Sequence, residues 1–152
     1  MLKWIVRLVL LAAVAFGLAQ LVPYRVHNPK TRHEPPWSSP QTRQLAVAAC
    51  FDCHSNQTRG TWYENIAPVA WWINHHVSEG RARLNFSEWA PGKYDGDRAA
   101  RAVLRGSMPP PYYTWFGLHA DAKLTAQQRQ QLAAGLQATL GPGNDTGRYE
   151  RQ

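Results

Sequence analysis

The chain has 152 residues and a formal net charge of +7, and 44% of its residues are hydrophobic, enough for one compact domain with short extensions. Its basic residues are scattered and no nucleic-acid-binding motif is present, so nucleic acid is excluded as a partner. The positive charge instead favours anionic lipid headgroups or acidic proteins.

Residues 1–22 predict an export signal or a membrane anchor. Lys3 and Arg7 precede an uncharged run from Leu8 to Val22, which, extended past Arg7, reaches the lower limit for a helix that crosses a bilayer. The stretch from Gly17 to Ala19 offers a site for signal cleavage, so cleavage stays open, but we favour an uncleaved anchor. The basic residues before the run place the rest of the chain in the periplasm, beyond a bacterial inner membrane crossed once.

Residues 23–40 contain five prolines and few apolar side chains, which predicts a semi-extended tether that gives the following domain reach from the membrane. Ser39 and Pro40 are typical of a helix start, as the cap and the first helical residue. We expect this helix to run through Ala49 into the next motif.

Cys50, Cys53 and His54 form the pattern Cys-x-x-Cys-His. Residues three and four apart share one face of a helix, so the two thiols and the imidazole point to the same side. This is the spacing of a c-type haem site, in which the thiols form thioethers to the two vinyl groups and the histidine binds the iron. The sequence therefore predicts one covalently bound haem c.

Three other interpretations of these residues are weaker. A zinc site needs a second pair of ligands at a suitable spacing, and His75 and His76 are adjacent. A thioredoxin-like redox pair needs a βαβ context, and nothing around Cys50 alternates like a strand. A disulfide would close a very short loop and leave His54 unexplained. Haem attachment remains the preferred hypothesis.

Aromatic residues and histidines follow the motif. Trp62 and Tyr63 lie in a predicted loop, where they either line the core or hydrogen-bond a haem propionate. A second helix is predicted from Ile66 to Glu79, with Gly80 just past its end. His75 is a candidate iron ligand from this helix. Four residues share one face at helical spacing: Val69, Trp72, Ile73 and His76.

Met108 is the predicted distal ligand of the iron. It follows a third helix, which either Asp95 or Asp97 caps and which ends at Gly106. Met108 is the only internal methionine, its thioether is a soft ligand suited to haem iron, and the three prolines after it hold the loop rigid. The alternative distal ligand is His75.

A capping box of Thr125 and Gln128 predicts a last helix that continues to Leu140. Its apolar stripe should pack against the helix that begins at Pro40. We expect the haem domain to occupy residues 41–141 and residues 142–152 to form a flexible tail, so the chain is predicted to be all-α.

Six short segments follow one another in a specific order: Glu34–Trp37, Cys50–His54, Asn65–Pro68, Trp72–Arg81, Leu84–Trp89 and Met108–Pro110. In this order they resemble the bacterial cytochrome c-type haem-binding domain family, over nearly the whole stretch from Pro35 to Leu140. The resemblance implies a small exported monohaem domain, often membrane-anchored, with a cytochrome c-like helical fold. Because it extends around His75 as well as Met108, it leaves the distal ligand open.

We expect the protein to transfer single electrons and not to be an enzyme, because iron held by both His54 and Met108 has no free position for a substrate. Its partners would be redox proteins, with membership of a larger membrane complex open. The alternatives are a gas or redox sensor, or an accessory haem subunit of an oxidoreductase complex. A peroxidase would need an open iron position and an acid–base group, for which His75 or His76 would have to serve.

Overall fold

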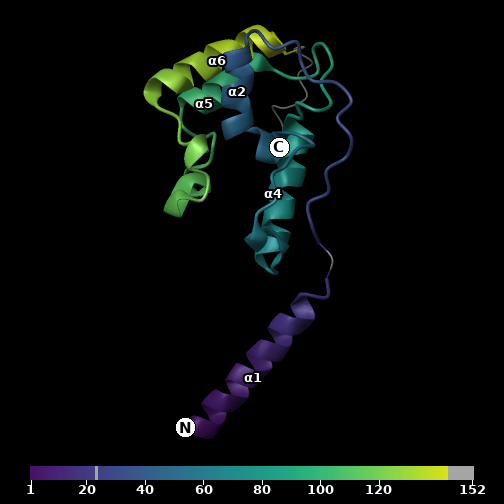
Figure 1. Ribbon diagram of the computed structural model, residues 1–152, viewed down its shortest axis with the longest axis vertical. Coiled ribbons are helices and arrows are strands. Elements are labelled where there is room, and N and C mark those ends of the chain that lie inside the picture. The colour runs from purple at the N-terminus through teal and green to yellow at the C-terminus, as the bar shows by residue number, and fades with distance from the viewer. Residues whose placement is uncertain (23, 144–152) are drawn as a thin grey trace, which may run out of the picture.

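The computed structural model describes residues 1–22 and 24–143, which are helical and contain no strand (Figure 1). The predicted all-α class is confirmed. In chain order the helices are α1 (Leu2–Ala19), α2 (Pro40–Ala49), α3 (Phe51–His54), α4 (Val69–Arg83), α5 (Gly96–Leu104) and α6 (Ala126–Leu140), with the 3-10 turns η1 (Trp62–Asn65), η2 (Pro111–Gly117) and η3 (Ala120–Ala122).

Helix α1 stands apart from the rest of the chain (Figure 1), and none of its residues is buried. Its 18 residues are apolar enough to cross a membrane, and at 1.5 Å per residue they span about 27 Å, close to the thickness of a bilayer core. The predicted apolar helix is therefore present.

Helices α2, α5 and α6 pack together and form the core of the domain (Figure 1). Ser39 caps α2 as predicted, because its hydroxyl accepts a hydrogen bond of 3.0 Å from the backbone N–H of Thr42. Helix α6 crosses α2 closely at Gly135, where a Cβ would lie 2.2 Å from Thr42 Oγ1. The largest fully buried apolar side chains are Phe86, Leu132 and Leu136.

The predicted caps of the last two helices are also confirmed. Asp95, and not Asp97, caps α5, accepting a hydrogen bond of 2.9 Å from the backbone N–H of residue 98. Thr125 and Gln128 form the capping box of α6, with hydrogen bonds of 3.2 and 2.8 Å in opposite directions. Of the predicted tail, residues 144–152 lie outside the described residues.

Helix α4 differs from its prediction at both ends. It runs from Val69 to Arg83, so Gly80 lies inside the helix and does not follow its end. The reason is packing, because a Cβ at position 80 would lie only 2.4 Å from the carbonyl oxygen of Cys53. Glycine at this position lets α4 approach α3, and the sequence alone does not distinguish this role from a helix end.

The predicted tether is extended, but it does not hang free of the domain. We call residues 24–39, all of which are described, the strap; residue 23 of the predicted tether lies outside the described residues. Arg81 of α4 donates a hydrogen bond of 2.6 Å to the carbonyl oxygen of His27. Further along, the backbone N–H of His33 donates to the carbonyl oxygen of Ser87 at 3.2 Å. These bonds hold the strap against the domain.

Candidate haem site

The Cys-x-x-Cys-His motif forms one helical turn, as predicted. Helix α2 ends at Ala49, and Cys50 adopts φ −129° and ψ −35°, so α3 sets off in a new direction. The carbonyl oxygen of Cys50 accepts hydrogen bonds from the backbone N–H groups of Cys53 and His54, at 3.2 and 2.9 Å. The two residues within the motif, Phe51 and Asp52, are buried, and the residues Cys50, Cys53 and His54 are each partly buried. The turn thus presents its three reactive groups together.

His54 is oriented by the last turn of α4. Its Nδ1 lies 2.9 Å from the carbonyl oxygen of Gly80 and 3.0 Å from that of Leu84. Because carbonyl oxygens only accept, the ring proton is on Nδ1 and the lone pair of Nε2 is available to a metal. Burial lowers the pKa of His54, although the two carbonyl bonds act in the opposite direction. The imidazole is therefore neutral and ready to bind iron.

Neither cysteine forms a disulfide. Both are free thiols, so the disulfide interpretation receives no support. Burial raises the pKa of Cys50 to about 12 and that of Cys53 to about 11, so both sulfurs are protonated at neutral pH. Within the described residues no group of three or more histidine, cysteine or acidic side chains is placed to hold a metal ion, which leaves zinc without a site.

A buried carboxylate inside the motif, which the sequence analysis did not single out, ties the turn to the rest of the domain. Asp52 accepts hydrogen bonds from the Arg59 backbone at 2.9 Å, from the Arg59 guanidinium at 2.8 to 3.1 Å, and from the Tyr113 hydroxyl. Burial acts to raise the pKa of Asp52, but these bonds outweigh it and the pKa is lowered. Arg59 also bonds Asp121 at 2.7 Å. The turn is thus fixed by an ionised, fully bonded carboxylate.

One face of α4 leads away from the motif and is apolar but only partly covered. This face carries Val69, Trp72, Ile73 and His76, which the sequence places on one side of the helix. Val69 is 40% exposed and Trp72 is 50% exposed. The Trp72 ring lies 4.2 Å from the ring of His76 and 5.2 Å from that of Tyr112 in η2, measured between centroids. An incompletely covered aromatic face that begins beside Gly80 suits a flat apolar ligand attached at the neighbouring turn.

The two adjacent histidines of α4 lie in different surroundings. His76 is partly buried within the aromatic group, and its Nδ1 lies 2.9 Å from the carbonyl oxygen of Trp72. His75 is exposed, and its ring meets the edge of the His76 ring at 5.9 Å. Of the two imidazoles, His76 is therefore the one that lies on the aromatic face with Tyr112.

Met108 does not belong to the group formed by the motif; it lies between α5 and η2 and is 36% exposed. Its backbone is held on both sides. The N–H donates to the carbonyl oxygen of Ala102 at 3.2 Å, and the carbonyl oxygen accepts from Arg129 at 3.3 Å. The loop is therefore fixed to α5 and α6, as its proline content predicts.

The two aromatic residues predicted to line the core or to bond a propionate are largely exposed or bonded to another protein group. Trp62 is 77% exposed, and the Tyr63 hydroxyl is hydrogen-bonded to His119 at 2.9 Å. His119 in turn stacks on Tyr113 with ring centroids 3.9 Å apart. The hydroxyl of Tyr63 and the ring of Tyr113 thus both contact His119. These contacts help to hold η2 near the motif.

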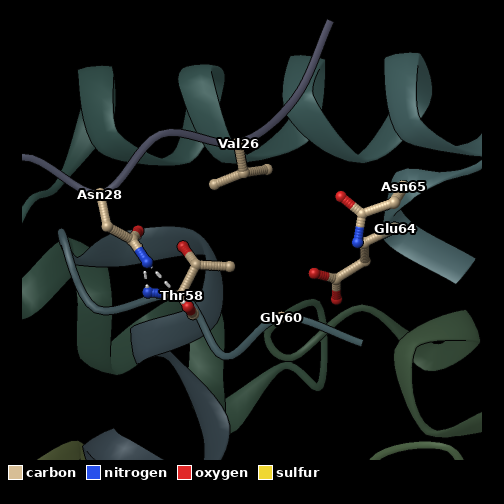
Figure 2. Close-up of a pocket in the computed structure, with 6 residues that line it drawn as sticks. All are labelled: Val26, Asn28, Thr58, Gly60, Glu64 and Asn65. Atoms are coloured by element: carbon tan, nitrogen blue, oxygen red, sulfur yellow. Dashed lines mark hydrogen bonds between the residues drawn. The ribbon is translucent and has the colours of Figure 1, made fainter. Parts of the chain in front are cut away.

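Two surface pockets lie elsewhere and involve none of the predicted ligands. The first, of about 130 Å³, lies between the strap and η1 (Figure 2), and in that view Asn28 bonds Thr58 at one end while Glu64 and Asn65 stand at the other. The second, of about 370 Å³, lies beside the Met108 loop and includes Trp115 among its walls. Neither is lined by residues of the motif.

Two thiols and a neutral, oriented imidazole on one turn, facing an open aromatic surface in an all-helical domain, define a haem-binding domain. The comparison with protein families agrees, because the model of the haem-binding domain family matches residues 14–138. The chain belongs to this family, and the predicted family is confirmed. Searches of curated proteins and of solved structures returned no match.

Proposed function

We propose that the chain is a membrane-anchored monohaem c-type cytochrome that transfers single electrons on the periplasmic side of a bacterial inner membrane. The observation that carries this proposal is the α3 turn. It brings both thiols together with the imidazole of His54, whose Nδ1 is hydrogen-bonded to the carbonyl oxygens of Gly80 and Leu84. Bound haem would supply an iron that cycles between the ferric and ferrous states.

Covalent attachment requires only the groups that the turn presents. Each thiol, of Cys50 and of Cys53, adds across one vinyl group, so that a sulfur–carbon bond forms and the thiol hydrogen passes to the other vinyl carbon. No electron acceptor and no leaving group are needed. Acidified acetone should therefore leave the pigment on the protein. Release of the pigment into the solvent would contradict the c-type assignment but not haem binding itself.

Met108 is our choice for the distal ligand, with His75 as the alternative. The rigid attachment of its loop to α5 and α6 limits the entropy lost when the thioether binds iron. A ligand on each face of the haem leaves no position for substrate, which favours electron transfer over catalysis. A methionine-ligated ferric haem has a weak near-infrared absorption band, and Met108→Ala should abolish it. If His75→Ala alters the spectrum while Met108→Ala does not, the histidine is the ligand.

A gas or redox sensor is the second candidate, and the partial exposure of Met108 favours it. A thioether at the surface is displaceable, and carbon monoxide or nitric oxide would then reach the iron. Binding of carbon monoxide by the unmutated ferrous protein at micromolar concentration would support the sensor. A ferrous spectrum that carbon monoxide leaves unchanged would support electron transfer.

The location and the partners follow from the charge and the apolar helix. Lys3 and Arg7 lie at the amino end of α1, and by the positive-inside rule they would stay in the cytoplasm. Without Lys3 and Arg7 the net charge of +7 becomes +5 for the exported part, which would favour acidic redox proteins as electron donor and acceptor. These partners could belong to a larger membrane complex. Protease added to spheroplasts should digest the haem domain, and protection of the domain would contradict the orientation.

A further inference from the structure

Several large apolar side chains of the domain are more than half exposed. They belong to η1 and to the stretch from the end of η2 to Leu118. Phe116 is 94% exposed and adopts a φ of 56°, a left-handed conformation that a phenylalanine seldom takes. Trp62 is 77% exposed. Trp115 and Leu118, on either side of the tip, are 58% and 55% exposed. We call these four residues the apolar rim.

The end of α1 is joined to the domain beside the first of these segments. The side chain of Gln20 bonds both backbone groups of Ala67: it donates to the carbonyl oxygen at 3.2 Å and accepts from the N–H at 3.0 Å. Ala67 precedes α4, and Trp62 lies five residues before it, within about 18 Å even for a fully extended chain. The end of the apolar helix and Trp62 are therefore close together.

The second segment lies on the same side of the domain. Figure 1 shows that the first turns of α4 and the η2 segment both project from the layer of α2, α5 and α6 towards the side on which α1 lies. The chain that leaves α1 supplies Tyr24, which is 49% exposed, and the exposed Arg25. An aromatic ring and a cation directly after an apolar helix are typical of the headgroup zone of a membrane.

The strap prevents the domain from moving far from this position. Arg81 bonds the carbonyl oxygen of His27 at 2.6 Å, and Asn28 exchanges hydrogen bonds with Thr58 at 2.9 and 3.2 Å. These bonds begin only a few residues after α1 ends. The strap cannot leave the domain without breaking them, so only the few residues between α1 and His27 act as a linker and the strap is not a long flexible tether.

From this geometry we propose that the apolar rim rests in the headgroup region of the phospholipid bilayer that α1 crosses, so that the domain is docked on the membrane in one orientation. The proposal rests on the membrane anchoring in the proposed function and deepens it. A lipid surface is the occupant because, with α1 in a bilayer, the bonds of Gln20 place Ala67 and its neighbours at the headgroups. Aromatic rings are enriched at this depth in membrane proteins.

A docked domain holds its haem plane at a fixed angle to the membrane, which linear dichroism of the haem absorption measures in oriented bilayers of the full-length protein. We expect clear dichroism for the unmutated protein. The double variant Trp62→Ser, Phe116→Ser should lose at least half of it, and Gln20→Ala should also reduce it. Leu104→Ser is the matched control, because Leu104 is 55% exposed and belongs to α5. Figure 1 shows α5 in the layer that lies away from α1, so this replacement should change nothing.

An isotropic haem in the unmutated, membrane-bound protein would overturn the docking proposal, and so would a double variant that is as well oriented as the unmutated protein. An unchanged haem spectrum in each variant shows that the domain has folded.

The proposed function is tested by separate measurements. Release of the protein from membranes by alkaline carbonate would refute the anchor and the docking together, whereas release of pigment by acidified acetone would refute only the covalent haem, since bound haem still reports its orientation.

Discussion

Asp52 shows how a single side chain connects the Cys-x-x-Cys-His turn to the rest of the domain. It lies between the two cysteines and is 6% exposed, yet it carries a charge, because Arg59 and Tyr113 supply its hydrogen bonds. A buried carboxylate is tolerated only when such donors are present. The sequence shows the carboxylate but not its partners, since Tyr113 is 61 positions away along the chain. The network therefore had to be seen in the folded chain.

Replacing Tyr113 by phenylalanine should destabilise the protein by about 1.5 to 3 kcal/mol, because it removes a hydrogen bond to a buried charge. Urea unfolding, followed by circular dichroism, measures the change. Tyr94→Phe is the matched control, since the Tyr94 ring is buried but its hydroxyl makes no hydrogen bond within the described residues. Equal midpoints for the two variants would show that the Tyr113 hydroxyl contributes nothing.

Glu34 predicts a specific dependence of stability on pH. The hydrogen bond from Arg43, at 2.8 Å, together with one from Trp37, lowers the pKa of this carboxyl to about 2, although burial acts against the shift. A lowered pKa means that Glu34 stabilises the fold fully above its ordinary value of 4.5 and that this contribution is lost as the pH falls towards 2.

The difference in unfolding midpoint between the unmutated protein and Glu34→Gln should therefore be largest near pH 6 and should vanish near pH 2. Urea titrations across this range measure it. Glu79→Gln serves as control, because its carboxylate lies 3.7 Å from Arg83 at an exposed position and an exposed pair contributes little. A difference for Glu34→Gln that does not depend on pH would contradict the assignment.

Local sequence signals predicted the helices well, and long-range packing accounts for the differences. The helix caps act within one turn of the chain, so they can be predicted without knowledge of the fold. They are Ser39, Asp95 and the capping box of Thr125 and Gln128. Gly80 looks like a helix end but is required by the backbone of Cys53, 27 positions earlier. The strap likewise follows its prediction locally, being extended, and departs from it only in the bonds that it makes with distant residues.

Gly80→Ala tests the contact between α3 and α4. A Cβ would meet the Cys53 carbonyl oxygen at 2.4 Å, so the helices must separate, and His54 then loses the carbonyl groups that orient it. We expect a loss of about 1 to 3 kcal/mol in stability and a clearly lower ratio of haem to protein in purified material. The ratio is measured from the haem and protein absorbance bands.

Gly60→Ala is the control for this experiment. No atom lies within 4 Å of the position that its Cβ would take, so stability should change by no more than about 0.5 kcal/mol and the haem content should stay normal. Normal haem content in both variants would mean that the close approach at Gly80 does not position the motif.

For the molecule taken as a unit, the division between α1 and the domain is the main feature. No residue of α1 is buried, whereas all the residues of the hydrophobic core around α2, α5 and α6 come from the domain itself. The candidate site has one part that the sequence reveals and one that it does not. The motif is local and was found from its spacing. The aromatic face opposite Tyr112 forms only where η2 meets α4. The sequence places Trp72 and His76 on one side of a helix without indicating what faces them.

Replacing residues 1–19 by a cleavable export signal should release a folded, soluble haem domain, because α1 contributes nothing to the buried core. The haem spectrum and the urea midpoint of the released domain should match those of the full-length protein in detergent, within about 0.5 kcal/mol. A colourless or aggregated product would show that the domain depends on α1 for more than its location.

The contact between α2 and α6 also sets the order in which the polypeptide can mature. The backbone N–H of Ser38 donates to the Thr139 hydroxyl at 3.1 Å, and Ser38 also bonds the carbonyl oxygen of Gly135, so the beginning of the domain is completed by its last helix. Synthesis runs from the amino end, so α6 leaves the ribosome after Cys50 and Cys53. The cysteines consequently emerge before the core can close around them, so both sulfurs are still accessible on an open chain at that stage.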